Sequence, residues 1–304
     1  AVSSLRQTAL RDLRVSAVTA NRYAEHVLRL TEFWARVGLA PVSLDDLDAA
    51  VAEFLEELWA DGGASTTARY VVAGVQHFVP AARRCLELSW SLTRTWGRLE
   101  PPTRAVPLSC TLVLALAARA CEQGWTDVGT MLLVGFEAML RTGELFNLAA
   151  SDVMFMERGA VIRLVSTKMG VRQGRSEMVQ LHCPMVVDLL RAHTRPLAAD
   201  ARLSARTPLQ LRGCLHDLVN YFGLSHVRYT WYSLRRGGAT ADFLEHGSME
   251  TTIVRGRWAA GRTARLYVEQ AVADSVTAVL DRSQADRISD YASRWSVRAP
   301  TSSL

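Results

Sequence analysis

The stretch Tyr232-Ser-Leu-Arg-Arg-Gly-Gly-Ala-Thr240 carries more information about the fold than any other part of this chain. We predict that it opens a helix over residues 230–246. Two adjacent glycines, Gly237 and Gly238, are unfavourable inside a helix and cost about 1 kcal/mol each relative to alanine. Their presence indicates that another backbone, or DNA, approaches the helix closely at this point.

A second informative segment lies downstream. Arg255-Gly-Arg-Trp258 follows a predicted short helix over 249–255, and Tyr267 comes nine residues after Trp258. We predict a further helix over 263–280 that carries Tyr267. Taken alone, a tyrosine among apolar residues is typical of a core position, and a lone tryptophan is typical of packing. The meaning of both residues therefore depends on the other segments.

Upstream, the segment Met139-Leu-Arg-Thr-Gly-Glu-Leu145 lies where a predicted helix over 126–139 ends and another begins. It contributes Arg141 and Glu144. Alone, each side chain is compatible with an ordinary charge at a helix terminus.

Between Leu145 and Tyr232, the sequence pattern of residues 160–181 predicts a β-hairpin. Ala160–Ser166 alternates and is rich in β-branched residues, and Glu177–Leu181 is its returning strand. The turn between them carries Lys168, the only lysine among 35 basic residues. Arginine replaces lysine at most solvated positions, so a retained lysine suggests an ammonium group that must release a proton. Chance survival of one lysine is the alternative.

In this order, the segments resemble the catalytic domain of the tyrosine recombinases, the family of phage integrases and related transposon enzymes. The resemblance covers roughly residues 105–275. Each motif is weak alone, whereas five motifs in register are specific. The positions that match the family pattern are Arg141, Lys168, Tyr232 with Arg235, Trp258 and Tyr267.

The resemblance implies cleavage and rejoining of DNA without a metal or another cofactor. Tyr267 would attack the phosphate and conserve the bond energy in a 3′-phosphotyrosyl linkage, which a 5′-hydroxyl can later reverse. Lys168 would protonate the leaving 5′-oxygen as a general acid, a role that needs a tunable pKa.

The same resemblance implies a clamp on the phosphate. Arg141 and Arg235 would bind the nonbridging oxygens and neutralise the charge of the pentavalent transition state. Trp258 would donate its indole N–H to the same phosphate. Glu144 would brace Arg141 from behind.

One position departs from the family pattern. Tyr232 stands where the family usually has the histidine of its His-x-x-Arg motif. A tyrosine hydroxyl can donate to a phosphate, but its reference pKa of about 10 makes it a poor base near neutral pH. We therefore expect a reduced rate or an altered pH dependence rather than a loss of activity.

Charge favours an anionic partner for the C-terminal part. Residues 1–104 hold 12 basic and 12 acidic side chains, whereas residues 105–304 hold 23 and 18 and carry the whole net charge of +5. We predict double-stranded DNA as the partner. Of the arginines outside the active site named next, we expect at least half to be ordinary solvated surface residues instead. The predicted contacts outside the active site are Arg172, Arg175, Arg236, Arg255, Arg257 and Arg262.

The predicted fold is mainly α-helical with a small β-hairpin, in two domains that clamp duplex DNA. Residues 1–100 resemble the family's core-binding domain in position and helix content, with helices over Thr19–Val37, Leu44–Trp59, Ser65–Phe78 and about 81–92. Residues 101–107 form a linker, since the ten residues from Arg98 to Pro107 include three prolines. Residues 108–304 form the catalytic domain. Its tail, 271–297, docks either on a neighbouring protomer of a dimer or tetramer assembled on DNA, or within its own chain.

Other classes are disfavoured. The five scattered cysteines form no CxxC pair, which argues against a zinc site or a disulfide framework and favours a reducing, intracellular setting. No apolar run reaches the roughly 18 to 20 residues of a membrane span. Two alternatives stay open: a catalytically impaired DNA-binding protein derived from a recombinase, and an enzyme like the type IB topoisomerases.

Overall fold

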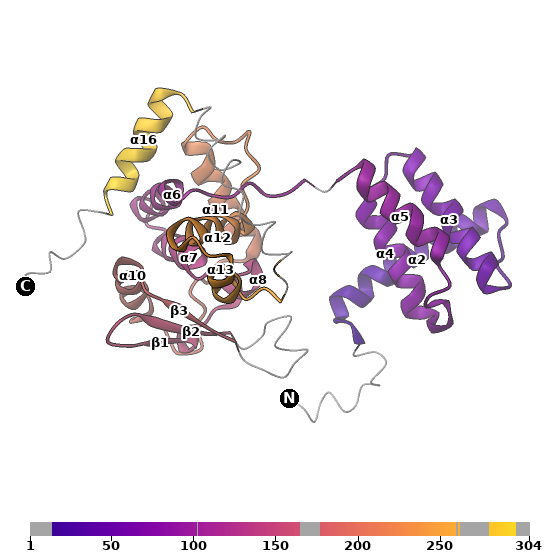
Figure 1. Ribbon diagram of the computed structural model, residues 1–304, viewed down its shortest axis with the longest axis horizontal. Helices are drawn as coiled ribbons and strands as arrows, with labels where there is room; N and C mark the ends of the chain where they lie inside the picture. The colour runs from indigo at the N-terminus through magenta and orange to yellow at the C-terminus, as the bar shows by residue number, and fades with distance from the viewer. Residues whose placement is uncertain (1–13, 102, 165–176, 260, 262–279, 296–304) are drawn as a thin grey trace, which may run out of the picture. The chain divides into compact units, whose positions relative to one another are not determined.

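A computed structural model of the chain describes residues 14–101, 103–164, 177–259, 261 and 280–295. The chain divides into two compact units, Ala1–Thr103 and Arg104–Leu304, called here the N-terminal and C-terminal units (Figure 1). The division falls inside the predicted linker, and each unit has a hydrophobic core of its own. The described residues form helices and one small sheet, as predicted.

The N-terminal unit is a bundle of α-helices, and its first two helices lie within two residues of their predicted bounds. Gly38 closes α2 with a left-handed backbone at φ 76°. Ser43 caps α3: its hydroxyl accepts the Asp46 N–H, and the Asp46 carboxylate accepts the Ser43 N–H, both at 3.1 Å. The helices are α2 (Ala17–Val37), α3 (Leu44–Ala60), α4 (Ser65–Phe78) and α5 (Glu87–Leu99).

The bounds predicted for the fourth helix, about 81–92, were wrong. Pro80–Ala82 forms a single 3-10 turn, and α5 begins only at Glu87. A carboxylate from α3 fixes this start, because Asp48 accepts the N–H groups of Leu88 and Ser89 at 2.9 and 3.0 Å. A cap that comes from 40 residues away leaves no local pattern in the sequence.

The C-terminal unit combines helices with a three-stranded antiparallel sheet that lies at one edge of the unit (Figure 1). No helix in the described ranges is long and apolar enough to cross a membrane. The elements are α6 (Cys110–Glu122), α7 (Thr126–Glu137), α8 (Thr142–Asn147), β1 (Val153–Phe155), β2 (Ala160–Leu164), β3 (Glu177–Leu181), α10 (Pro184–Thr194), α11 (Pro208–Tyr221), α12 (Tyr232–His246), α13 (Met249–Gly256) and α16 (Arg282–Ser293).

The two predicted strands pair with each other. Ala160 lies opposite Leu181, and Leu164 lies opposite Glu177. A third strand, β1, pairs with the other edge of β2. Sequence reasoning missed β1 because three residues are too few to establish an alternating pattern.

Residues Ser233–Thr240 of helix α12 are buried, and the two glycines among them explain how the helix fits. A Cβ atom at Gly237 would lie 1.9 Å from the Leu108 carbonyl oxygen. A Cβ atom at Gly238 would lie 2.1 Å from the Phe136 carbonyl oxygen. The predicted close approach is therefore confirmed, and the approaching group is protein backbone.

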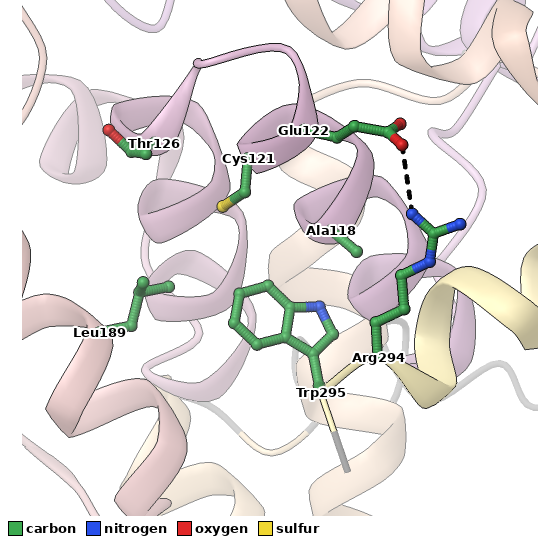
Figure 2. Close-up of a pocket in the computed structure, with 7 residues that line it drawn as sticks. All are labelled: Ala118, Cys121, Glu122, Thr126, Leu189, Arg294 and Trp295. Atoms are coloured by element: carbon green, nitrogen blue, oxygen red, sulfur yellow. Dashed lines mark hydrogen bonds and ion pairs between the residues drawn. The ribbon is translucent and has the colours of Figure 1, made fainter. Parts of the chain in front are cut away.

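The described part of the C-terminal tail packs on its own chain. Helix α16 lies against α6 (Figure 1), where the Tyr291 hydroxyl donates to Glu122 at 2.6 Å. Trp295 is buried beside Ala118, and its indole N–H donates to the Leu114 carbonyl at 2.9 Å; Figure 2 shows this ring with the Arg294–Glu122 ion pair. Hydrogen bonds from Tyr291 and Arg119 lower the pKa of Glu122 to about 2.

Candidate active site

Arg235 occupies the centre of the candidate site. It lies in the first turn of α12 and is only 1% exposed. Its guanidinium donates to two backbone carbonyl oxygens, that of Met139, two residues after the end of α7, and, at 2.6 Å, that of Gly256 at the end of α13. These bonds fix the guanidinium between two helix ends, where carbonyl groups lack partners within their own helix.

Trp258 forms one wall around Arg235. The guanidinium carbon lies 4.5 Å from the centre of the Trp258 ring, a cation–π distance. The ring folds back over α13, so that a Cβ atom at Gly256 would lie 1.7 Å from it. Glycine at 256 is therefore needed for the ring to reach the arginine. Met139 and Ala239 pack with Trp258 in a small buried cluster.

Arg141 and Glu144 form the second part of the site, at the start of α8. The Glu144 carboxylate accepts the Arg141 backbone N–H at 2.9 Å and its guanidinium at 2.6 Å. The Arg141 side chain is 30% exposed, whereas Glu144 is buried. The predicted bracing of Arg141 by Glu144 is thus present, and it leaves the guanidinium accessible from outside.

A second arginine reaches the same carboxylate. The Arg257 guanidinium lies 2.9 Å from Glu144 and 3.1 Å from Glu177, the first residue of β3. We call Arg141, Glu144, Glu177 and Arg257 the charged cluster. Burial alone would raise the Glu144 pKa, but the positive charge of Arg257 and the hydrogen bonds from Arg141 outweigh it, so the pKa lies below its usual value.

Tyr232 lies one helical turn before Arg235 and is 36% exposed. It lines a groove of about 820 Å³ together with Thr142, the neighbour of Arg141. The groove lies between the starts of α8 and α12 and one side of α11. The described members of the predicted set, Arg141, Tyr232, Arg235 and Trp258, therefore gather at neighbouring helix ends.

The arginines predicted to contact DNA have different environments. Arg236 is 3% exposed, and Arg257 is held by two carboxylates, so burial disfavours a phosphate contact for both. Arg255 forms an ion pair with the buried Asp242. Arg172, Arg175 and Arg262 lie outside the described residues, as do Lys168 and Tyr267.

Sequence reasoning missed the link between Arg257 and Glu177. The two residues are 80 positions apart; Arg257 was predicted only as a DNA contact, and Glu177 belongs to none of the motif segments. A weak signal existed: Glu177 opens the returning strand of the predicted hairpin, and Arg257 stands directly before Trp258. Only the fold, which brings the end of α13 to the start of β3, places them together.

The site and its fold can be compared with known proteins. No protein-family model matches the sequence, and no curated protein matches it as a relative. Solved structures do match. XerH site-specific recombinase bound to palindromic difH substrate, in a post-cleavage complex, matches with a TM-score of 0.60 and 14% identity, over 84% of this chain and 78% of that one.

Two further structures give the same result. A lambda integrase dimer bound to a COC′ core site matches with a TM-score of 0.59 and 14% identity, over 86% of this chain and 74% of that one. The Tn1549 transposon integrase in complex with circular intermediate DNA matches with a TM-score of 0.56 and 16% identity, over 87% and 99%. The chain thus has the fold of DNA recombinases and integrases. More particularly, it is the fold of the tyrosine recombinases.

Proposed function

We propose that this chain cleaves and rejoins duplex DNA at specific sites through a 3′-phosphotyrosyl intermediate, with Tyr267 as the nucleophile. One observation carries the proposal. Four residues that a sequence pattern selected, from three separate segments, gather at neighbouring helix ends in a tyrosine recombinase fold. A protein that only binds DNA has no need for all five of the motif residues Arg141, Lys168, Arg235, Trp258 and Tyr267.

The proposed reaction balances without a cofactor. The Tyr267 hydroxyl gives up its proton to solvent water, its oxygen forms a bond to phosphorus, and the bond from phosphorus to the 5′-oxygen breaks. Lys168 supplies the proton that the leaving 5′-oxygen takes up. Attack by a 5′-hydroxyl on the phosphotyrosine then reverses these steps and rejoins the strand.

The phosphate clamp has two unequal arms. Arg141 is accessible, and Glu144 holds its guanidinium, so it meets the incoming phosphate first. Arg235 is buried, so a phosphate reaches it only when neighbouring residues move aside. Trp258 keeps Arg235 in place through its ring, and Tyr232 offers a hydroxyl at the groove beside them.

DNA binding in this proposal draws on both units. The N-terminal unit grips one face of the duplex and the C-terminal unit the other, with Arg172, Arg175 and Arg262 as phosphate contacts in addition to the clamp. The known lambda integrase structure is a dimer on DNA, and we propose a dimer or tetramer for this chain on its sites. Because arginine–phosphate contacts release counterions, affinity should fall steeply with salt.

A covalent adduct tests the enzyme. The purified chain is incubated with nicked duplexes that cover the DNA on both sides of its gene, and protein–DNA adducts are separated in denaturing gels. We expect an adduct with the native chain and none with Tyr267→Phe, which keeps the ring and removes the attacking hydroxyl. An adduct that persisted in Tyr267→Phe would place the nucleophile elsewhere.

A second candidate function is DNA binding without cleavage, and Tyr232 is the observation that favours it. Under our main proposal, Tyr232→His restores the family pattern and speeds cleavage by about tenfold near pH 7. A variant that cleaved no faster at any pH would contradict our interpretation of position 232. Specific binding to a verified site, with no adduct in either form, would favour the binding protein.

A further inference from the structure

The residue before Trp258 has an unusual backbone. Arg257 ends α13 in the left-handed region at φ 58°, which side chains other than glycine rarely adopt. The described residues contain two other non-glycine positions of this kind, Arg84 and Met139. Glycine would adopt the same backbone without strain, so the arginine side chain at 257 must contribute something that a glycine lacks.

The Arg257 side chain joins two separate elements. It is 10% exposed, and its two terminal nitrogens contact different carboxylates, Glu144 in α8 and Glu177 in β3, at 2.9 and 3.1 Å. A planar guanidinium suits this task, because its donors point in fixed and divergent directions, whereas an ammonium is a single point charge. Since both terminal nitrogens already meet carboxylates, a direct phosphate contact is disfavoured.

The backbone around Arg257 serves the other half of the site. The Gly256 carbonyl accepts from Arg235, and the Trp258 ring lies against the same guanidinium. Three consecutive residues therefore contact three parts of the site. Gly256 and Trp258 contact Arg235. Arg257 contacts Glu144 in α8 and Glu177 in β3. A change in the Arg257 side chain acts on all of these at once.

We propose that Arg257 is a positioning residue that holds β3 and the start of α8 in register with Arg235 and Trp258. The inference rests on the proposed function, and it replaces our prediction that Arg257 contacts DNA. Its consequence is that the strand leading out of the Lys168 hairpin and the Arg141 arm of the clamp depend on one guanidinium. Misplacing reacting groups by about 1 Å costs on the order of 100-fold in rate.

The test uses Arg257→Gly, which relaxes the backbone and removes both ion pairs. Arg84→Gly is the matched control: it relaxes the same type of backbone at an exposed arginine of the N-terminal unit. Single-turnover cleavage is measured on the nicked duplex that gives an adduct with the native chain. At saturating DNA we expect Arg257→Gly to lower the rate about 100-fold while DNA affinity stays within about threefold, and Arg84→Gly to leave the rate unchanged.

Two further variants test how much each ion pair of Arg257 contributes to the cleavage rate. Arg257→Lys keeps the charge and should regain about tenfold of the rate, because one carboxylate is still paired. Glu177→Gln removes the β3 contact alone and should cost about tenfold. Added to Arg257→Gly, it should cost nothing more, because two changes at one contact are not additive.

Hydrogen exchange separates this inference from the proposed function, because it needs no DNA. We expect amides in 177–181 and 142–147 to exchange faster in Arg257→Gly than in the native chain, and those in α6 to be unchanged. If the native chain forms no adduct, the proposed function fails, and exchange alone decides the role of Arg257. Unchanged exchange in both segments would overturn the proposal, as would cleavage within threefold of native or a loss confined to DNA affinity.

Discussion

Two neighbouring regions of the C-terminal unit are held together in opposite ways. Where α12 meets α7 and the segment before α6, backbone lies on backbone, with the carbonyls of Leu108 and Phe136 against Gly237 and Gly238; we call this the packed region. In the second region, the charged cluster joins α8, α13 and β3 through guanidinium–carboxylate contacts of 2.6 to 3.1 Å. The first region has no room for a methyl group, and the second depends on charge.

This difference assigns different roles to the two regions. Close backbone packing is insensitive to pH but intolerant of added volume, so substitutions there should cost stability. Paired charges tolerate a change of shape better and respond to proton concentration. We therefore expect the packed region to determine whether the unit folds, and the charged cluster to determine whether the folded unit positions its proposed reacting groups.

The largest expected effect tests the packed contact. Gly237→Ala places a Cβ atom 1.9 Å from the Leu108 carbonyl oxygen, so α12 must move away from the segment before α6. We expect this change to lower the free energy of unfolding by about 3 kcal/mol. Urea denaturation of the full chain, followed by circular dichroism, measures the loss.

Gly213→Ala is the matched control for this prediction. Gly213 lies inside α11, and a Cβ atom there would have nothing within 4 Å. Helix propensity alone then acts, and alanine should stabilise the chain by up to about 1 kcal/mol. Equal effects of the two substitutions would show that helix propensity, and not the packed contact, governs α12.

The next effect in size tests the charged cluster. Glu144→Gln removes the charge that faces Arg141 and Arg257, and we expect it to destabilise the unit by about 2 kcal/mol at pH 7. The folded-state pKa of Glu144 is lowered, so its stabilising charge is fully present above the unfolded-state pKa of about 4.3. The stabilisation is lost as the pH falls through the folded-state value.

The pH dependence is therefore the sharper measurement for Glu144. Unfolding of the native chain and of Glu144→Gln should differ most at neutral pH and converge below about pH 4. Gly237→Ala should show no such convergence, because no titrating group lies in that contact. A gap between native and Glu144→Gln that stayed constant down to pH 3 would contradict a charge-based role for the cluster.

Much of the packed region could be predicted from the sequence, because its signals are local. Two glycines inside a helical pattern indicated a close approach, and the structure places the Leu108 and Phe136 carbonyls there. Alternation over Ala160–Ser166 predicted the strand that the structure describes as Ala160–Leu164, and Glu177–Leu181 was predicted as its returning strand. The motif residues were found because they stand at fixed spacing within short segments.

The charged cluster could be predicted only in part, because its second half is non-local. Glu144 stands three residues after Arg141, and a short spacing of this kind is visible in a sequence. Glu177 and Arg257 are 80 residues apart, and Asp48 caps α5 from 40 residues away. Such pairs depend on how elements pack, and one sequence without its fold does not record that.

The smallest expected effect concerns a carboxylate between the two regions. Glu137 ends α7, and one of its oxygens accepts the N–H groups of His182 and Cys183 at 2.6 and 2.8 Å. Its other oxygen is buried without a hydrogen-bond partner in the described residues. Burial is the main cause of its raised pKa, and the two backbone hydrogen bonds only partly offset it.

Because the pKa of Glu137 is raised, ionisation of Glu137 lowers the stability of the fold, whereas ionisation of Glu144 increases it. Ionised Glu137 destabilises the fold, and this penalty grows as the pH rises from about 4.3 through the folded-state value. Glu137→Gln should therefore stabilise the chain by about 1 kcal/mol at pH 7, and the gain should vanish below about pH 4. The exposed Glu157→Gln is the control and should change stability by less than about 0.5 kcal/mol. If Glu137→Gln instead lost stability at pH 7, the two backbone hydrogen bonds would outweigh burial, and both carboxylates would stabilise their regions as charges.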